Sequence, residues 1–333
     1  METLTLPAAV ESRDAAGARA GSSSTKLKKP SAGKTALNIV KRIVYPRHAV
    51  ALAKCFRAQK RDRKSSHDAE LKFCADVLPG DFLNYGFYDD PSIPPEQISL
   101  HHIQQAQIRY GQLLVDEIRD KNGPVLDAGC GMGGLLNLLV AQGFTATALT
   151  PNHSQIEHIH TRHPHVPLIE GKFDPETLQN YGGRFSTVIT SESFQYMKLV
   201  PGLKTLRHVL APGGRWILCD YFRIAETKRR SGHQWTDFND ALATHGWRIV
   251  SQRDITANVL PTLRYLHMLG GRVGTAAADF ILGKIRRKRP ALHHLLEEAI
   301  GDWRAYLSDQ VQTVSPEVFA REKKYMLMVM EPS

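Results

Sequence analysis

The chain has 333 residues, of which 42% are hydrophobic and 23% charged, a composition typical of globular proteins with one large α/β domain or two domains. No run of about 18 apolar residues occurs, which argues against a membrane-spanning helix, and the N-terminus lacks the apolar segment of a secretory signal. The four cysteines match no disulfide or zinc pattern, so we expect a reducing, cytoplasmic location.

Positive charge is concentrated near the N-terminus. The whole chain carries +10, whereas residues 26–64 carry +12, because they contain thirteen Lys or Arg and one acid, Asp62. The rest of the chain is therefore nearly neutral, at −2. Enzymes that act on nucleic acids usually carry their positive charge on the working face, so this distribution argues against a nucleic-acid partner.

The first 79 residues form two predicted segments. Residues 1–35 have low complexity and are predicted to be a disordered tail. Residues 36–79 predict a basic helical arm with partly apolar faces. The sequence leaves three roles open for this arm: a solvated helix packed on the body, a contact with an anionic membrane, or a cover over the binding site.

From about residue 95 the chain alternates between helical and strand patterns, which predicts an α/β fold with a Rossmann-like, doubly wound mixed sheet. The predicted helices are 103–118, 133–143, 153–162 and 203–210. The predicted strands are 124–129, 144–150, 166–171, 185–190, 215–222, 247–255 and 323–330. We assign 80–256 and 323–333 to the main domain and 257–322 to a helical substrate cap inserted before the last strand. Ligands of such sheets bind at the carboxyl ends of the strands.

The strongest motif is VLDAGCGMGG at residues 125–134. A strand delivers Asp127, and Gly129 and Gly131 then let the backbone turn tightly against a ligand. The string also satisfies the GxGxxG pattern of dinucleotide-binding folds. Those folds usually carry an acid at the end of the second strand, where this chain has TATALTPNHSQ. The dinucleotide interpretation is therefore disfavoured.

The motif instead resembles that of class I S-adenosylmethionine-dependent methyltransferases, as does LAPGGRWILCDYF around the fifth strand. The strings LTPNHSQ, EGKFD and FLNYGFYDD resemble the branch containing cyclopropane-fatty-acid, sterol, tocopherol and prenyl-diphosphate methyltransferases. The resemblance covers residues 80–256 and the last strand. It implies S-adenosylmethionine as methyl donor, with Thr150 and Gln155 near the ribose, Phe173 against adenine and Asp174 at its amino group. The complete implied donor-binding set is Tyr85, Asp127, Gly129, Gly131, Thr150, Gln155, Phe173, Asp174 and Ser191.

The string SESFQYM at residues 191–197 follows the fourth strand. Cyclopropane synthases carry Phe-Glu-His where this chain has Phe194-Gln195-Tyr196, so ring closure by their mechanism is not expected. Sterol, tocopherol and prenyl-diphosphate enzymes resemble this chain in a glutamate that matches Glu192. In an apolar pocket the pKa of Glu192 rises, which suits a general base. The alternative is that Glu192 is a structural hydrogen-bond acceptor or binds the amino group of the methyl donor.

We therefore expect C-methylation of a hydrophobic isoprenoid or unsaturated lipid, with Glu192 as the base and Tyr196 and Tyr221 shaping the pocket. Mg²⁺ is expected only if the acceptor is a diphosphate. O- or N-methylation of an aromatic natural product is the main rival, and a non-catalytic protein that binds a membrane or partner is the alternative of another class. Whether the chain self-associates is left open.

Two further clusters are less specific. The string HIHTRHPH places histidines two residues apart on a helix, where they point to different sides, so a metal site is disfavoured. The basic string KIRRKR at residues 284–289 follows an apolar helical run. Positive charge at a helix C-terminus stabilises the helix, and a site for a diphosphate, a lipid headgroup or a membrane surface is the alternative.

Overall fold

The computed structural model describes residues 80–226, 231–290, 294 and 315–333. The predicted tail and basic arm lie outside these residues. Within the part of the chain that is described, no helix is long and apolar enough to cross a lipid bilayer.

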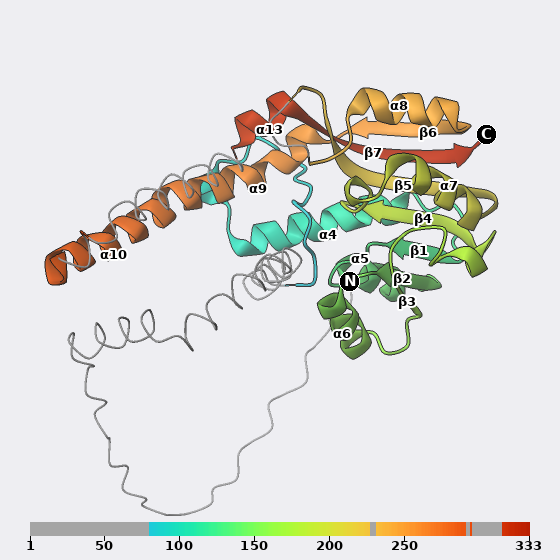
Figure 1. Ribbon diagram of the computed structural model, residues 1–333, viewed down its shortest axis with the longest axis horizontal. Helices are drawn as coiled ribbons and strands as arrows, with labels where there is room; N and C mark the ends of the chain where they lie inside the picture. The colour runs from blue at the N-terminus through green and yellow to red at the C-terminus, as the bar shows by residue number, and fades with distance from the viewer. Residues whose placement is uncertain (1–79, 227–230, 291–293, 295–314) are drawn as a thin grey trace, which may run out of the picture. The chain divides into compact units, whose positions relative to one another are not determined.

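The centre of the domain is a seven-stranded sheet with the order β3-β2-β1-β4-β5-β7-β6 (Figure 1). Only β7 runs antiparallel to its neighbours, β5 and β6. The predicted Rossmann-like mixed sheet is therefore confirmed. The strands are β1 Val125–Ala128, β2 Ala146–Thr150, β3 Leu168–Glu170, β4 Phe185–Ser191, β5 Leu210–Arg223, β6 Trp247–Asp254 and β7 Lys323–Pro332.

Helices cover both faces of the sheet (Figure 1). They are α4 Leu100–Asp116, α5 Gly134–Ala141, α6 His153–Arg162, α7 Leu199–Val209, α8 Trp235–Thr244, α9 Thr256–Leu269, α10 Thr275–Lys288 and α13 Pro316–Glu322. The short turns of helix are η1 Pro95–Gln97, η2 Gln179–Tyr181, η3 Phe194–Tyr196 and a π-helical turn, η4 Gly270–Gly274. Helix α8 was not predicted, although Trp235, Phe238 and Leu242 have helical spacing.

Successive residues of the central strands enter opposite cores, as the period of two in a strand requires. In β5, Trp216 and Leu218 pack on the face covered by α7 and α8, whereas Ile217 and Cys219 pack on the face covered by α4 and α5. Because both faces are buried, these strands appear in the sequence as continuous apolar runs. Because β1, β2, β4 and β5 run parallel, their carboxyl ends meet at one edge of the sheet.

The segment predicted as a cap begins with helix α9, continues through η4 into α10, and ends with α13 (Figure 1). Residues 291–293 and 295–314 lie outside the described part of the chain. Pro261 lies inside α9 and is buried there. Helix α13 leads directly into β7, so its residues lie beside the carboxyl ends of the strands.

Candidate active site

A tight turn joins β1 to α5. Gly129 and Gly131 have φ angles of 91° and 57°, in the left-handed region that favours glycine. A Cβ on Gly129 would lie 2.4 Å from the Cβ of Ser193, so the turn after β4 packs directly on the glycine turn. The Ser193 hydroxyl also donates to the Ala128 carbonyl at 2.6 Å. The glycine turn and the SESFQYM segment therefore form one unit.

Asp127 lies at the end of β1 and is only 1% exposed. Its Oδ2 atom has no hydrogen-bond partner among the protein atoms. Burial raises the pKa of Asp127 to about 7, because the ionised carboxylate loses its contact with water. An unpaired buried carboxylate is costly, and a positively charged or hydrogen-bond-donating ligand is the group that fits it.

At the end of β2, two residues that were predicted to bind the methyl donor contact each other. The Thr150 hydroxyl donates to Gln155 Oε1 at 2.6 Å, and both side chains are buried. Phe173 packs in the core beside Leu149 and Ile169, which brings it to the same edge. Asp174 instead accepts a hydrogen bond from the Thr177 backbone N–H at 2.9 Å, which lowers its pKa.

Residues 81–86 cross this edge from the glycine turn to Glu192. The Gly134 N–H donates to the Asp81 carbonyl at 3.2 Å, and a Cβ on Gly131 would lie 3.6 Å from Leu83. At the other end, the Tyr85 N–H donates to Glu192 Oε1 at 3.2 Å. Residues 81–86, the crossing segment, thus contact both the glycine turn, where the methyl donor is predicted to bind, and Glu192, where the methyl acceptor is predicted to bind.

Two helices hold the crossing segment in place. From α4, Gln107 Nε2 donates to the Asn84 carbonyl at 2.8 Å. Gly86, with φ 77°, passes so close to α4 that a Cβ there would lie 2.8 Å from the Cβ of Ala106. From α9, the Thr262 hydroxyl donates to the Tyr85 carbonyl at 2.6 Å. The position of Tyr85 is therefore fixed from both sides.

Glu192 follows the last residue of β4 and has a φ of 48°, the only positive value for a non-glycine residue in the described part of the chain. Such strained backbone tends to occur at functional sites. Its Oε1 accepts the Tyr325 hydroxyl at 2.5 Å in addition to the Tyr85 N–H. Burial raises the pKa of Glu192 to about 7, although both hydrogen bonds act to lower it.

The Glu192 carboxylate is the end of a buried hydrogen-bond chain. The Tyr325 hydroxyl lies 3.1 Å from the Tyr110 hydroxyl, which in turn receives a hydrogen bond from Ser191 at 3.2 Å. Tyr110 also donates to the Cys219 carbonyl at 3.2 Å. Tyr110 and Tyr325 were missed by the sequence analysis. The signal for Tyr325 was its position near the start of the last strand, beside the carboxyl end of the fifth.

Aromatic rings gather next to Glu192. Tyr85 and Tyr221 each make edge-on contacts with Phe319 of α13, with ring centroids 6.2 and 5.9 Å apart. The Tyr325 ring centroid lies 6.5 Å from that of Tyr85 and 6.3 Å from that of Tyr221. Lys323 Nζ lies 4.0 Å from the centre of the Tyr221 ring. The site therefore combines the Glu192 carboxylate with electron-rich aromatic rings, which favour a positive centre.

A second carboxyl group, Asp220, was also missed by the sequence analysis. It is 1% exposed and accepts the backbone N–H groups of Gln195 and Tyr221 at 3.0 and 2.9 Å. Burial raises the pKa of Asp220 to about 8, and the charge of Glu192 adds to this rise. Asp220 thereby ties β5 to the turn that carries Glu192.

The structure places Tyr196 differently from Tyr221. Tyr196 ends the turn η3 and is 70% exposed, whereas Tyr221 is buried. The predicted site residues brought together near Glu192 are therefore Tyr85, Ser191 and Tyr221, with Tyr196 at the open side of this group. Asp127, Gly129, Gly131, Thr150, Gln155 and Phe173 gather around the ends of β1 and β2.

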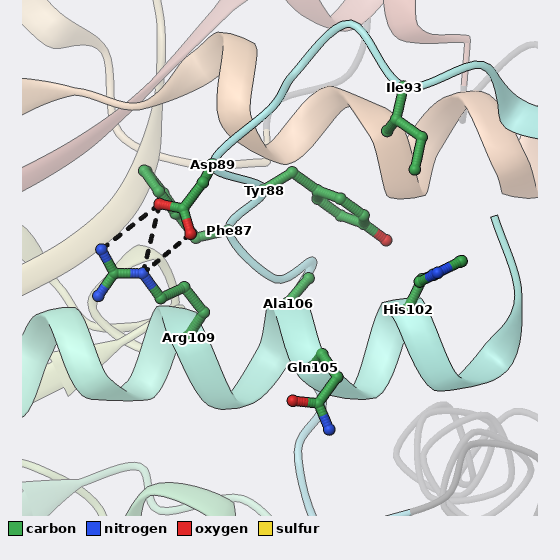
Figure 2. Close-up of a pocket in the computed structure, with 8 residues that line it drawn as sticks. All are labelled: Phe87, Tyr88, Asp89, Ile93, His102, Gln105, Ala106 and Arg109. Carbon is green, nitrogen blue, oxygen red and sulfur yellow. Dashed lines mark hydrogen bonds and ion pairs between the residues drawn. The ribbon is translucent and has the colours of Figure 1, made fainter. Parts of the chain in front are cut away.

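A separate hollow of about 340 Å³ lies where α4 meets the chain after the crossing segment (Figure 2). An ion pair between Arg109 of α4 and Asp89 borders it, and Tyr88 and Ile93 face it from the chain segment opposite α4. It contains none of the predicted site residues, so we do not assign the active site to it. Across the described residues, no group of three His, Cys, Asp or Glu side chains is arranged to hold a metal ion.

Sequence comparisons identify a family and relatives. Residues 100–257 match the family described as "Methyltransferase domain". The chain is 27% identical to a fatty-acid O-methyltransferase of Mycolicibacterium smegmatis, over 68% of this chain and 81% of that protein. It is 30% identical to the 2-methyl-6-phytyl-1,4-hydroquinone methyltransferase of a Synechocystis species, over 43% of this chain and 45% of that protein.

The fold is shared with solved structures. A geranyl diphosphate C-methyltransferase from Streptomyces coelicolor A3(2), in complex with Mg²⁺, geranyl diphosphate and S-adenosyl-L-homocysteine, superposes with a TM-score of 0.54. The match covers 78% of this chain and 93% of that one at 14% identity, and so shows the fold alone. Residues 100–257 are therefore similar to a methyltransferase domain, and the strand order is consistent with the Rossmann-like class I methyltransferase fold.

Proposed function

We propose that this chain is an S-adenosylmethionine-dependent methyltransferase that adds a methyl group to an unsaturated carbon of a hydrophobic isoprenoid or lipid. The observation that carries the proposal is the half-buried Glu192 carboxylate, which Tyr325 and Tyr85 hold in one orientation. With a pKa of about 7, it is partly ionised at neutral pH and can accept a proton.

The donor would be held at the ends of β1 and β2. S-adenosylmethionine supplies an electrophilic methyl group on a positively charged sulfur. The unpaired Oδ2 of Asp127 suits the positively charged amino-acid part of the donor, and the open backbone at Gly131 suits close approach. Thr150 and Gln155 would bind the ribose, and Phe173 the adenine, while Asp174 would lie near the adenine amino group. Ser191 and Tyr85 would lie near the methionine end.

Glu192 would complete the reaction as the base. Attack of an alkene on the methyl group would form a new C–C bond while the S–CH3 bond breaks, would release neutral S-adenosylhomocysteine, and would leave a positive charge on the neighbouring carbon. The faces of Tyr85 and Tyr221 would favour that charge. Transfer of an adjacent C–H proton to the Glu192 carboxylate restores the double bond. Phe319 of α13 would exclude water from the positive carbon, so we assign the helices α9 and α13 to the wall of the acceptor site.

O-methylation of a carboxylic acid is the second candidate function. It is favoured by the similarity to a fatty-acid O-methyltransferase, which extends over 68% of this chain. A carboxylate attacks the methyl group directly and needs no base, so this function leaves the strained and hydrogen-bonded Glu192 without a catalytic role. Mg²⁺ enters the proposal only with a diphosphate acceptor, because such an acceptor brings its own metal-binding oxygens.

The test is an acceptor screen with an isotopically labelled methyl donor. Prenyl diphosphates, quinols, unsaturated lipids and fatty acids would be incubated with the full chain, and the labelled atom located by mass spectrometry and NMR. We expect the label on carbon, with product formation at least about 100-fold slower in the Glu192→Gln variant. Label found only on oxygen, at equal rates in both proteins, would refute C-methylation and favour the second candidate.

A further inference from the structure

Helix α10 presents apolar side chains to solvent that no part of the proposed reaction uses. Phe280 is 64% exposed and Ile281 55%, and Val273 in the preceding turn is 58% exposed. Helix α10 continues the line of α9 and extends away from the sheet (Figure 1). Single exposed apolar residues are common, but three close together, one of them a phenylalanine, are typical of an interaction surface.

The exposed face of α10 also carries positive charge. Ala277, Phe280, Ile281, Lys284 and Lys288 recur at spacings of three and four, which places them on one face of the helix. Leu282 lies on the opposite face and is only 9% exposed, so the other side of the helix is the covered one. Residues 275–289 contain five Lys or Arg and a single acid, Asp279.

Stabilisation of the helix end explains only part of this pattern. Cations in the last turn interact favourably with the helix dipole, and Arg286, Arg287 and Lys288 occupy that turn. The dipole does not account for Phe280 and Ile281, one to two turns earlier on the face that Lys284 and Lys288 share. Lys284 Nζ lies 5.4 Å from the Phe280 ring centre, so charge and apolar surface alternate within the same patch.

We propose that this face of α10 docks the enzyme on a membrane surface that contains anionic lipids. An apolar strip with Phe and Ile, interspersed with Lys and Arg, is the pattern of helices that lie in the lipid interface. Protein–protein interfaces are instead depleted of lysine at their centre. The ion pair between Arg272 and Glu96, at 2.9 Å, ties the start of the helix to the main domain.

Docking would serve a methyltransferase with a hydrophobic acceptor. Helix α9, which holds the Tyr85 carbonyl through Thr262, continues through η4 into α10. The inference rests on the hydrophobic acceptor class of the proposed function and not on which atom is methylated. Its failure is distinguishable, because vesicle binding and methyl transfer to a detergent-solubilised acceptor are measured separately.

The experiment combines vesicle flotation with hydrogen exchange on the full chain. Vesicles of phosphatidylcholine, with and without phosphatidylglycerol, would be mixed with the protein. Since residues 26–64 also carry excess positive charge, the readout must be local to α10. We expect amide exchange in residues 275–289 to slow with the anionic vesicles and to return toward the free value in high salt.

Two double variants separate the contribution of the apolar side chains from that of the positive charges. Phe280→Ser with Ile281→Ser should lower the vesicle partition coefficient about tenfold or more, and Arg287→Gln with Lys288→Gln should do so for anionic vesicles only. The matched control, Val140→Ser with Val200→Ser, changes exposed valines on α5 and α7 and should leave partitioning unchanged. Unchanged exchange on vesicle addition would overturn the proposal. So would protection that depends on protein concentration without vesicles, which would indicate a second copy.

Discussion

Asp127 and Glu192 are two carboxyl groups whose pKa is raised to about 7 by desolvation, but their surroundings differ. Asp127 ends β1 beside the glycine turn, and its Oδ2 atom has no hydrogen-bond partner in the protein. Glu192 follows β4, and one of its oxygens accepts two hydrogen bonds, from Tyr325 and Tyr85. Asp127 is thus fully buried with an unpaired carboxylate oxygen, whereas Glu192 is half-buried and hydrogen-bonded within the protein.

We propose that this difference separates a group that binds the methyl donor from a group that acts in catalysis. A carboxylate oxygen left unpaired in the protein gains its partner when a ligand arrives, so the proposal assigns Asp127 to donor affinity. A carboxylate already held by the protein gains little from ligand binding but is fixed in orientation, which is what proton transfer in a transition state requires. The predictions below change one of the two sites at a time.

The largest effect is expected at Asp127. Asp127→Ala should weaken binding of S-adenosylmethionine about 100-fold or more, because the positive donor loses a buried partner worth about 3 kcal/mol. Calorimetric titration measures this, with Asp240→Ala on the exposed side of α8 as the control. Retained affinity in the Asp127 variant would show that the unpaired oxygen is not a donor ligand.

A smaller effect is expected for Tyr325→Phe, which removes one hydrogen bond from Glu192. Because this hydrogen bond lowers the pKa of Glu192, its loss should raise that pKa above about 7. The acidic limb of the kcat profile should then move to higher pH, and kcat at neutral pH should fall about tenfold. A control, Tyr265→Phe on α9, removes a hydroxyl elsewhere. An unshifted profile with normal kcat would separate Tyr325 from catalysis.

The smallest effect is expected at Asp220, in stability rather than rate. A carboxyl group with a folded pKa of about 8, raised from 3.8, binds its proton more tightly in the folded state. The resulting stabilisation is present at low pH and is lost as the pH rises from about 4 through 8. Asp220→Asn should therefore make Tm less dependent on pH over this window. An equal slope of Tm against pH in both proteins would contradict the burial argument.

The contrast between the two carboxyl sites also explains how far the sequence could predict the structure. The Asp127 site was predictable because Asp127, Gly129 and Gly131 are contiguous and form a local turn. The partners of Glu192 were not, since Tyr325 is 133 residues away and meets it only because β7 lies antiparallel beside β5. The sheet, including that antiparallel strand, followed from apolar runs and from the family resemblance.

Smaller differences have local causes. Helix α8 was overlooked because its apolar residues are few, although Trp235, Phe238 and Leu242 have helical spacing. Asp174 was predicted at the adenine amino group, and its carboxylate accepts the Thr177 backbone N–H, a contact that caps its own loop. Tyr196 was predicted to shape the pocket, and its ring is mostly exposed because η3 turns it away from the core.

The most direct test of the account is single-turnover methyl transfer by Glu192→Gln, an isosteric change that removes the base. Donor affinity is measured on the same protein by calorimetry. The account predicts a rate at least about 100-fold lower than wild type, with donor affinity nearly unchanged. A wild-type rate of methyl transfer to carbon in this variant would contradict the assignment of Glu192 as the base.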